Sequence, residues 1–151
     1  MVLSPRATSF LGLILAVCLP NAAFGQEAKR PTEIAVIAND YTFLPLPETI
    51  SAGPTIFSFA NQGKVTHELS IGRLKASATV EQFTKADAPG RRDAIERSVG
   101  ILIAGPGKRP DGRILVDLVK GSTYVVFCNL KNTPDAPGHL TLGMYTSFTA
   151  Q

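Results

Sequence analysis

The sequence of 151 residues contains four side chains that could together bind a metal ion: His67, Cys128, His139 and Met144. Three of them fall in one C-terminal stretch, with ten residues between Cys128 and His139 and four between His139 and Met144. Thiolate and thioether sulfur are soft ligands that select copper, and imidazole suits copper as well. These ligand types therefore predict a site for one copper ion.

The first 25 residues have the pattern of a secretory signal peptide. Arg6 supplies a positive charge, residues 10–19 form an apolar run, and residues 23–25 form a small-x-small cleavage site. The run is too short to cross a bilayer of about 30 Å as a helix. We therefore expect a periplasmic mature protein that begins near Gln26 and has no membrane span. An uncleaved anchor and a lipid on Cys18 are the alternatives.

Removal of the signal would leave Cys128 as the single cysteine of an exported chain. An unpaired cysteine is unusual in an oxidising compartment, because disulfides form and persist there. Three interpretations stay open: a buried inert thiol, a disulfide between two chains, or a metal ligand. A lone buried cysteine most often serves as a small apolar side chain, and Met144 could likewise be a core residue. Zinc could also occupy the same ligands.

Composition indicates one folded domain. The chain is 44% hydrophobic and 18% charged, which is ordinary for a globular protein, and its length suits one core better than two. The formal net charge of +3 includes Arg6, so the mature domain is nearly balanced. Nothing in the charge indicates a nucleic acid partner.

Short strands separated by glycine and proline turns are expected to hold the four candidate ligands. Alternating or continuous apolar runs predict strands at 33–38, 41–44, 55–60, 67–71, 113–119, 123–128 and 145–149. Cys128 ends one of these strands, a loop returns with His139, and Met144 precedes the last strand. A loop whose ends are fixed by a scaffold is well suited to carry function, and His67 must come from a neighbouring strand.

The pattern changes at about 73–111, where we expect a short helical insertion. Thr79 and Gln82 match a capping box, which predicts a helix that ends at Pro89-Gly90, and a second helix is predicted over 91–99. The fold class is therefore all-β: a Greek-key sandwich of seven to eight strands. It occupies residues 32–151 and follows a flexible leader over 26–31.

Several stretches resemble the C-terminal half of the plastocyanin-like cupredoxins, the type 1 blue copper proteins. They are the run 116–128, the pair Gly138-His139 and the pair Gly143-Met144. Thr66-His67, after the turn at 61–63, resembles the place of the family's first histidine. The resemblance extends roughly from residue 33 to residue 149 and excludes the insertion.

This resemblance implies a cupredoxin-like fold and a copper site of known layout. His67, Cys128 and His139 would be the equatorial ligands and Met144 the axial one. Two features depart from the family. Ten residues separate Cys128 from His139, where plastocyanins and azurins have fewer, and Glu68 stands where those proteins have asparagine. A carboxylate there could accept backbone N–H bonds and would favour Cu(II) over Cu(I).

The function expected is that of an exported electron transport protein that carries one electron at a time. Its partner would be a redox protein or a copper donor or acceptor, and the protein would be a monomer. Copper trafficking without electron transfer and a metal-free interaction domain are the alternatives. The chain is not expected to be an enzyme, because two histidines are too few for the further copper centres of multicopper enzymes.

Three further groups of residues carry weaker hypotheses. A basic group is either a solvated face or a docking site for an acidic redox partner: Arg73, Lys75, Arg91, Arg92, Arg97, Lys108 and Arg109. An apolar collar is either core packing or the electron exit that cupredoxins expose: Ala136, Pro137, Leu140 and Leu142. A hydrophobic shell would exclude water from the site: Phe57, Phe59, Val126, Phe127 and Phe148.

Overall fold

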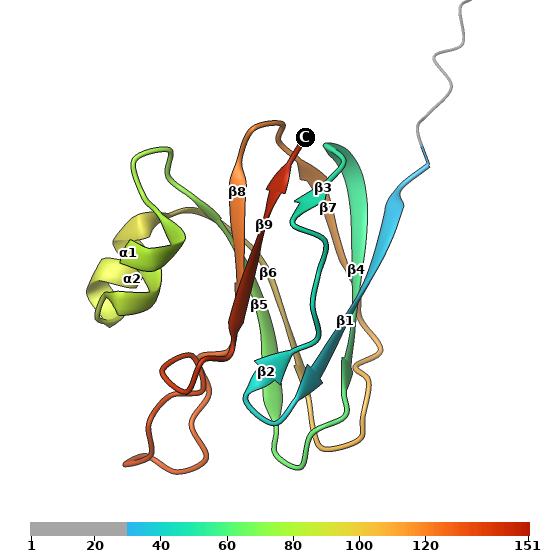
Figure 1. Cartoon of the computed structure of the whole chain (residues 1–151). Helices are drawn as coiled ribbons and strands as arrows, with labels where there is room; N and C mark the ends of the chain where they lie inside the picture. The colour runs from blue at the N-terminus through green and yellow to red at the C-terminus, as the bar shows by residue number, and fades with distance from the viewer. Residues whose placement is uncertain (1–29) are drawn as a thin grey trace, which may run out of the picture.

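Two β-sheets face each other in the computed structural model, which describes residues 30–151 (Figure 1). In spatial order, the first sheet contains β2 (Thr42–Phe43), β1 (Thr32–Asn39), β4 (Gly53–Asn61) and β7 (Ile114–Leu118). The second sheet contains β3 (Thr49–Ile50), β9 (Tyr145–Ala150), β8 (Thr123–Phe127), β5 (His67–Leu74) and β6 (Ile95–Ala104). The signal peptide predicted over 1–25 lies outside the described residues.

The predicted all-β sandwich is confirmed, and the described chain has nine strands instead of seven to eight. The two strands that were not predicted are β3, which has only two residues, and β6. The helix predicted over 91–99 is wrong in its second half, because β6 begins at Ile95. This strand pairs with β5 from Leu74–Ile95 to His67–Ala104, and a partner so distant leaves no local signal in the sequence.

The two helices, α1 (Val80–Lys85) and α2 (Ala88–Ala94), lie beside the second sheet (Figure 1). The predicted capping box at Thr79 is confirmed, with bonds in both directions between Thr79 and Gln82. Pro89 lies in the first turn of α2 and does not end a helix, since the missing N–H of proline costs nothing there. Helical structure in the expected insertion is therefore confined to residues 80–94.

The core between the sheets is aromatic at its centre. Phe148 stacks on Tyr124 with ring centroids 5.1 Å apart and lies 5.7 Å from the ring of Phe57. The same buried cluster includes Cys128 and Met144, so two of the candidate ligands are continuous with the core. The protein scaffold thus fixes both ends of the loop over 128–144.

One edge of the second sheet is formed by β6. Its Ile101 and Ile103 are 56% and 54% exposed, although both are large apolar side chains. Within residues 30–151, no helix has the length and apolar character needed to span a bilayer.

Candidate metal centre

Three of the four predicted ligands meet at one end of the sandwich. His67 begins β5, Cys128 directly follows β8, and His139 comes from the loop between β8 and β9. A nitrogen of each histidine and the sulfur of Cys128 all lie within 4.8 Å of one another. The exposed fractions of His67, Cys128 and His139 are 0%, 0% and 1%. The cluster is therefore buried from solvent.

The distances between these atoms suit a shared metal ion. The Nδ1 atoms of His67 and His139 are 3.2 Å apart, and Sγ of Cys128 lies 3.3 Å from Nδ1 of His139. Sulfur and nitrogen ligands that bind an ion at about 2.0–2.3 Å lie roughly 3–4 Å from each other. The three donor atoms thus have the spacing of one coordination shell.

Backbone hydrogen bonds shape the loop that carries His139. The N–H of Leu140 donates to the carbonyl of Cys128 at 2.8 Å, and the N–H of His139 donates to the carbonyl of Leu130 at 2.8 Å. These bonds fold the loop back on itself, so the imidazole returns to the strand end from which the loop departs. The ten intervening residues are accommodated without moving the two ligands apart.

Met144 lies at the base of the same loop and is fully buried. Its N–H donates to the carbonyl of His139 at 3.0 Å, and its carbonyl accepts from the N–H of Cys128 at 3.2 Å. The preceding Gly143 has φ +99°, a conformation that side chains other than glycine rarely adopt. That turn carries the chain from the ligand loop into β9 with Met144 facing the core.

Burial keeps the thiol of Cys128 protonated in the metal-free protein. The low-polarity surroundings raise the pKa of Cys128 above its usual 9.0, while the backbone N–H of Glu68, 3.3 Å from the sulfur, acts in the opposite direction. A coordinated metal ion deprotonates a thiol outright. The same N–H would then donate to a thiolate.

Both imidazoles are held neutral by the same cause. Burial lowers the pKa of His67, and the neighbouring His139 lowers it further. Burial likewise lowers the pKa of His139. Neutral imidazole is the form that binds metals, so each ring keeps one nitrogen lone pair available for a metal ion.

The carboxylate of Glu68 ties β5 to the residue after Cys128. Its Oε1 accepts from the hydroxyl of Ser70 at 2.6 Å and from the N–H of Asn129 at 3.4 Å. The expectation that a carboxylate here accepts a backbone N–H is confirmed. Glu68 is only 8% exposed, so its charge lies inside the site end of the sandwich.

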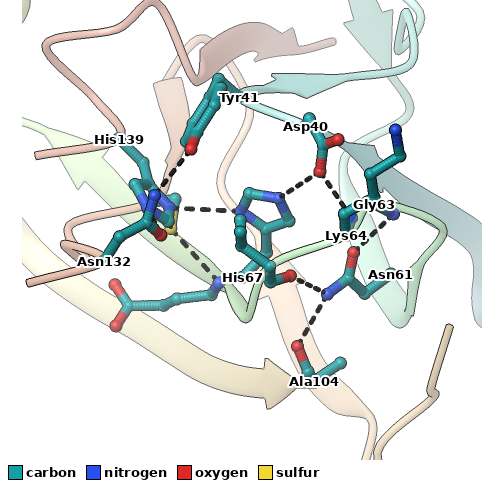
Figure 2. Close-up of polar contacts among 12 residues, drawn as sticks. Asp40, Tyr41, Asn61, Gly63, Lys64, His67, Ala104, Asn132 and His139 are labelled. Atoms are coloured by element: carbon teal, nitrogen blue, oxygen red, sulfur yellow. Dashed lines mark hydrogen bonds and ion pairs between the residues drawn. The ribbon is translucent and has the colours of Figure 1, made fainter. Parts of the chain in front are cut away.

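Asn61 fixes the turn that delivers His67, a role that sequence reasoning missed (Figure 2). Its Nδ2 donates to the carbonyls of Val65 and Ala104 at 2.8 and 2.9 Å, and its Oδ1 accepts from the N–H of Gly63 at 2.8 Å. The turn at 61–63 was recognised in the sequence, but the three partners of this buried side chain were not. The available signal was only an asparagine at the end of the predicted strand, six positions before His67.

Three further residues surround the histidines, and no sequence pattern indicated them (Figure 2). Oδ1 of Asp40 lies 3.9 Å from Nε2 of His67, which is too long for a hydrogen bond. The ring of Tyr41 stands edge-on to both imidazoles, with centroids 6.1 Å from His67 and 5.0 Å from His139. Asn132 contacts the outer nitrogen of His139 at 3.0 Å.

Of the five residues expected to form a hydrophobic shell, four lie in the buried core cluster that also contains Cys128 and Met144. Phe57, Phe59, Val126 and Phe148 are buried in the core cluster. Phe127 faces the opposite way and packs against Phe83 of α1, with ring centroids 5.0 Å apart. Phe127, the residue before Cys128, therefore packs β8 against α1.

The apolar collar and the basic group are each divided in the structure. In the collar, Leu140 is buried while Leu142 is exposed. In the basic group, Arg73 pairs with Glu96 and Lys75 pairs with Asp93. One leucine of the collar is thus packed inside the protein, and two side chains of the basic group form ion pairs within the chain.

Solved structures of blue copper proteins and their relatives share this architecture. Dithionite-reduced auracyanin from the photosynthetic bacterium Roseiflexus castenholzii matches with a TM-score of 0.56 and 18% identity, over 82% of this chain and 99% of that chain. Auracyanin A, a "blue" copper protein from Chloroflexus aurantiacus, matches with a TM-score of 0.55 and 16% identity, over 81% of this chain and 100% of that chain.

An azurin from the obligate methylotroph Methylomonas sp. strain J matches with a TM-score of 0.50 and 19% identity, over 80% of this chain and 98% of that chain. No protein-family model and no curated protein matches the sequence. The sheet arrangement and these matches, which span nearly the whole of each solved structure, confirm the predicted architecture. The chain has the cupredoxin fold.

Proposed function

We propose that the protein binds one copper ion through His67, Cys128, His139 and Met144 and acts as a one-electron carrier. The observation that carries this proposal is the buried convergence of one nitrogen of each histidine and the Sγ of Cys128 within 4.8 Å. Two imidazoles and a thiolate in a trigonal arrangement with a weak methionine ligand form the blue copper centre. The copper proteins that share the fold support the choice of metal.

Each residue would have a distinct role. His67, Cys128 and His139 would be the equatorial ligands, and Met144, at the base of the loop, would be the axial one. A bound copper ion would supply a Cu(II)/Cu(I) couple. The surrounding chain would hold the ligands in nearly one geometry in both oxidation states, since the backbone bonds of the loop and the buried core restrict their movement.

Electron transfer is favoured over copper trafficking by the closure of the site. A trafficking protein must exchange ligands with its acceptor. Here His67, Cys128 and His139 are at most 1% exposed. Electrons can pass to a docked redox partner without any ligand leaving the metal. We therefore infer a redox protein as the partner. We also propose that the carrier is a monomer and has no catalytic turnover.

The proposal is tested by loading the purified protein with Cu(II). We expect an intense sulfur-to-copper charge-transfer band and reversible one-electron electrochemistry. Cys128→Ser should abolish the band, because it removes the thiolate. A colourless product, or a band that survives Cys128→Ser, contradicts the proposal. Transfer of copper to an apo-acceptor without reversible electrochemistry supports trafficking instead.

Export to the periplasm is part of the same proposal and has its own measurement. The charged start, apolar run and small-x-small site of the first 25 residues support cleavage by signal peptidase. Intact-mass analysis of protein from the periplasmic fraction should give a chain that begins near Gln26. A retained Met1 or a lipid on Cys18 contradicts it.

A further inference from the structure

The outer nitrogen of His139 is capped by another residue of its own loop. Nε2 of His139 lies 3.0 Å from Oδ1 of Asn132. An amide oxygen can only accept a hydrogen bond, so the proton of this contact must belong to the imidazole. His139 is therefore in the tautomer that carries hydrogen on Nε2, and its Nδ1 has a free lone pair beside Sγ of Cys128 at 3.3 Å.

The amide of Asn132 is held in turn by Tyr41. Nδ2 of Asn132 donates to the hydroxyl of Tyr41 at 2.6 Å, which leaves Oδ1 to face His139. The two residues are 91 positions apart in the chain, so this contact joins the ligand loop to the turn between β1 and β2. Figure 2 shows Tyr41 and Asn132 together beside His139.

Tyr41 reaches this place through an uncommon backbone conformation. Its φ is +59°, and it is the only residue other than glycine with positive φ in the part of the chain that the structure describes. Such a conformation is unfavourable for a side chain as bulky as tyrosine. Here it directs the ring edge-on to the imidazole of His139, at a centroid distance of 5.0 Å.

We propose that Asn132 and Tyr41 are positioning residues that fix the metal-binding tautomer of His139 and cover its outer edge. Bonds of this kind, in which a ligand histidine donates its second N–H to an acceptor, orient the ring and raise its affinity for metal. The inference rests on the proposed copper site and adds to it. It also gives a role to the length of the ligand loop, because Asn132 lies in the stretch between Cys128 and His139.

The other histidine shows that the arrangement is specific to His139. Nε2 of His67 is buried and has no hydrogen-bond partner among the described residues, and Asp40 stays 3.9 Å away. Residues 30–151 thus provide a fixed acceptor for the outer nitrogen of His139 and none for that of His67. Only His139 is held by side chains on both sides.

The first test uses the full chain without metal, so that its result does not depend on copper binding. Nitrogen-15 NMR of the imidazole distinguishes the two tautomers directly. We expect His139 of the wild type to carry its proton on Nε2 and Asn132→Ala to show a mixture of tautomers. Asn132→Asp retains an acceptor oxygen and should restore the wild-type pattern. Tyr41→Phe keeps the ring but loses the hydroxyl, and should give a smaller shift toward the mixture.

The second test measures copper release to a chelator. Loss of a partner to a ligand histidine typically weakens metal binding about tenfold or more, so we expect roughly tenfold faster release from Asn132→Ala. Thr133→Ala is the matched control, because the side chain of Thr133 is exposed. Among the residues that the structure describes, only its carbonyl is engaged, by the N–H of Ala136. Its release rate should equal that of the wild type.

The two tests separate this inference from the proposed function. A wild type that binds no copper but shows a fixed Nε2–H tautomer contradicts the copper site and supports the capping of His139. If Asn132→Ala and the wild type have the same tautomer and the same release rate, the inference is overturned.

Discussion

Glu68 places a negative charge next to the two ligands of the central strands. It follows His67 directly, its N–H points at the sulfur of Cys128, and its carboxylate is almost fully buried. A buried charge is weakly screened by solvent. Its effect on a metal couple should therefore be larger than that of a surface carboxylate.

We expect Glu68→Gln to raise the reduction potential of the copper-loaded protein. Removal of the negative charge destabilises Cu(II) more than Cu(I), while the amide oxygen can still accept from Ser70 and Asn129. At an effective dielectric constant typical of proteins, the change should be on the order of 1 kcal/mol, or roughly 40 mV for a one-electron couple. Cyclic voltammetry measures it.

Glu48→Gln is the matched control for this substitution. Glu48 is exposed and precedes β3, which pairs with the far end of β9, so the same chemical change is made away from the site. An equal rise in both variants, or a fall in Glu68→Gln, would mean that the position of the Glu68 charge does not set the potential.

The ligands themselves could be predicted from residue types, whereas their supporting side chains could not. With only two histidines and two cysteines in the chain, the candidates were few and their chemistry was shared. Asn132 and Tyr41 meet across 91 positions, and neither residue type is diagnostic of such a contact. Only the folded geometry identifies it.

At the level of elements, the connection between β4 and β5 determines where His67 lies. Asn61 ends β4 and bonds three backbone groups, one of which belongs to Ala104 at the end of β6. This side chain therefore joins both sheets at the site end of the molecule. Its bonds satisfy polar groups that the fold buries.

Asn61→Ala should destabilise the metal-free protein by about 2–3 kcal/mol. The substitution leaves two carbonyls and one N–H without their partner, and each buried unsatisfied group costs about 1–3 kcal/mol before water or local shifts compensate. Chemical denaturation gives the change in the free energy of unfolding. Gln62→Ala, at the exposed neighbouring position, should stay within about 0.5 kcal/mol of the wild type. Equal stability of the two variants would show that the Asn61 bonds contribute little.

Elements with a local signal were predicted, and those that depend on distant pairing were not. The capping box at Thr79 and the apolar run before Cys128 are readable from adjacent residues. The strand β6 is not, because its first half is charged and its pairing with β5 supplies the missing hydrogen bonds. The helix predicted over 91–99 therefore extends beyond the observed end of α2 at Ala94.

For the molecule as a whole, the buried ligands should limit the pH range over which the metal-free protein is stably folded. The pKa values of His67 and His139 lie below the usual 6.5, so the unfolded chain takes up protons first as the pH falls. The pKa of Cys128 lies above the usual 9.0, so the unfolded chain loses its proton first as the pH rises. Because proton binding is coupled to unfolding, the metal-free protein should be most stable between about pH 6.5 and pH 9.

Denaturation of the metal-free protein across this range measures the effect. The contribution of the histidines should be lost as the pH falls through their lowered pKa values, and that of Cys128 as the pH rises through its raised value. Cys128→Ala should flatten the decline above pH 9 and leave the acid limb in place. A decline above pH 9 that is as steep in Cys128→Ala as in the wild type would assign it to other groups.

The edge strand β6 of the second sheet has a consequence for handling the protein. A long strand at a sheet boundary offers unpaired backbone groups to any other extended chain, and the run from Ser98 to Ala104 contains no charge or proline that would block such addition. Concentrated solutions should therefore form reversible aggregates through this strand. Ile101→Lys would disperse them, because a lysine on the margin of a sheet opposes the approach of a further strand.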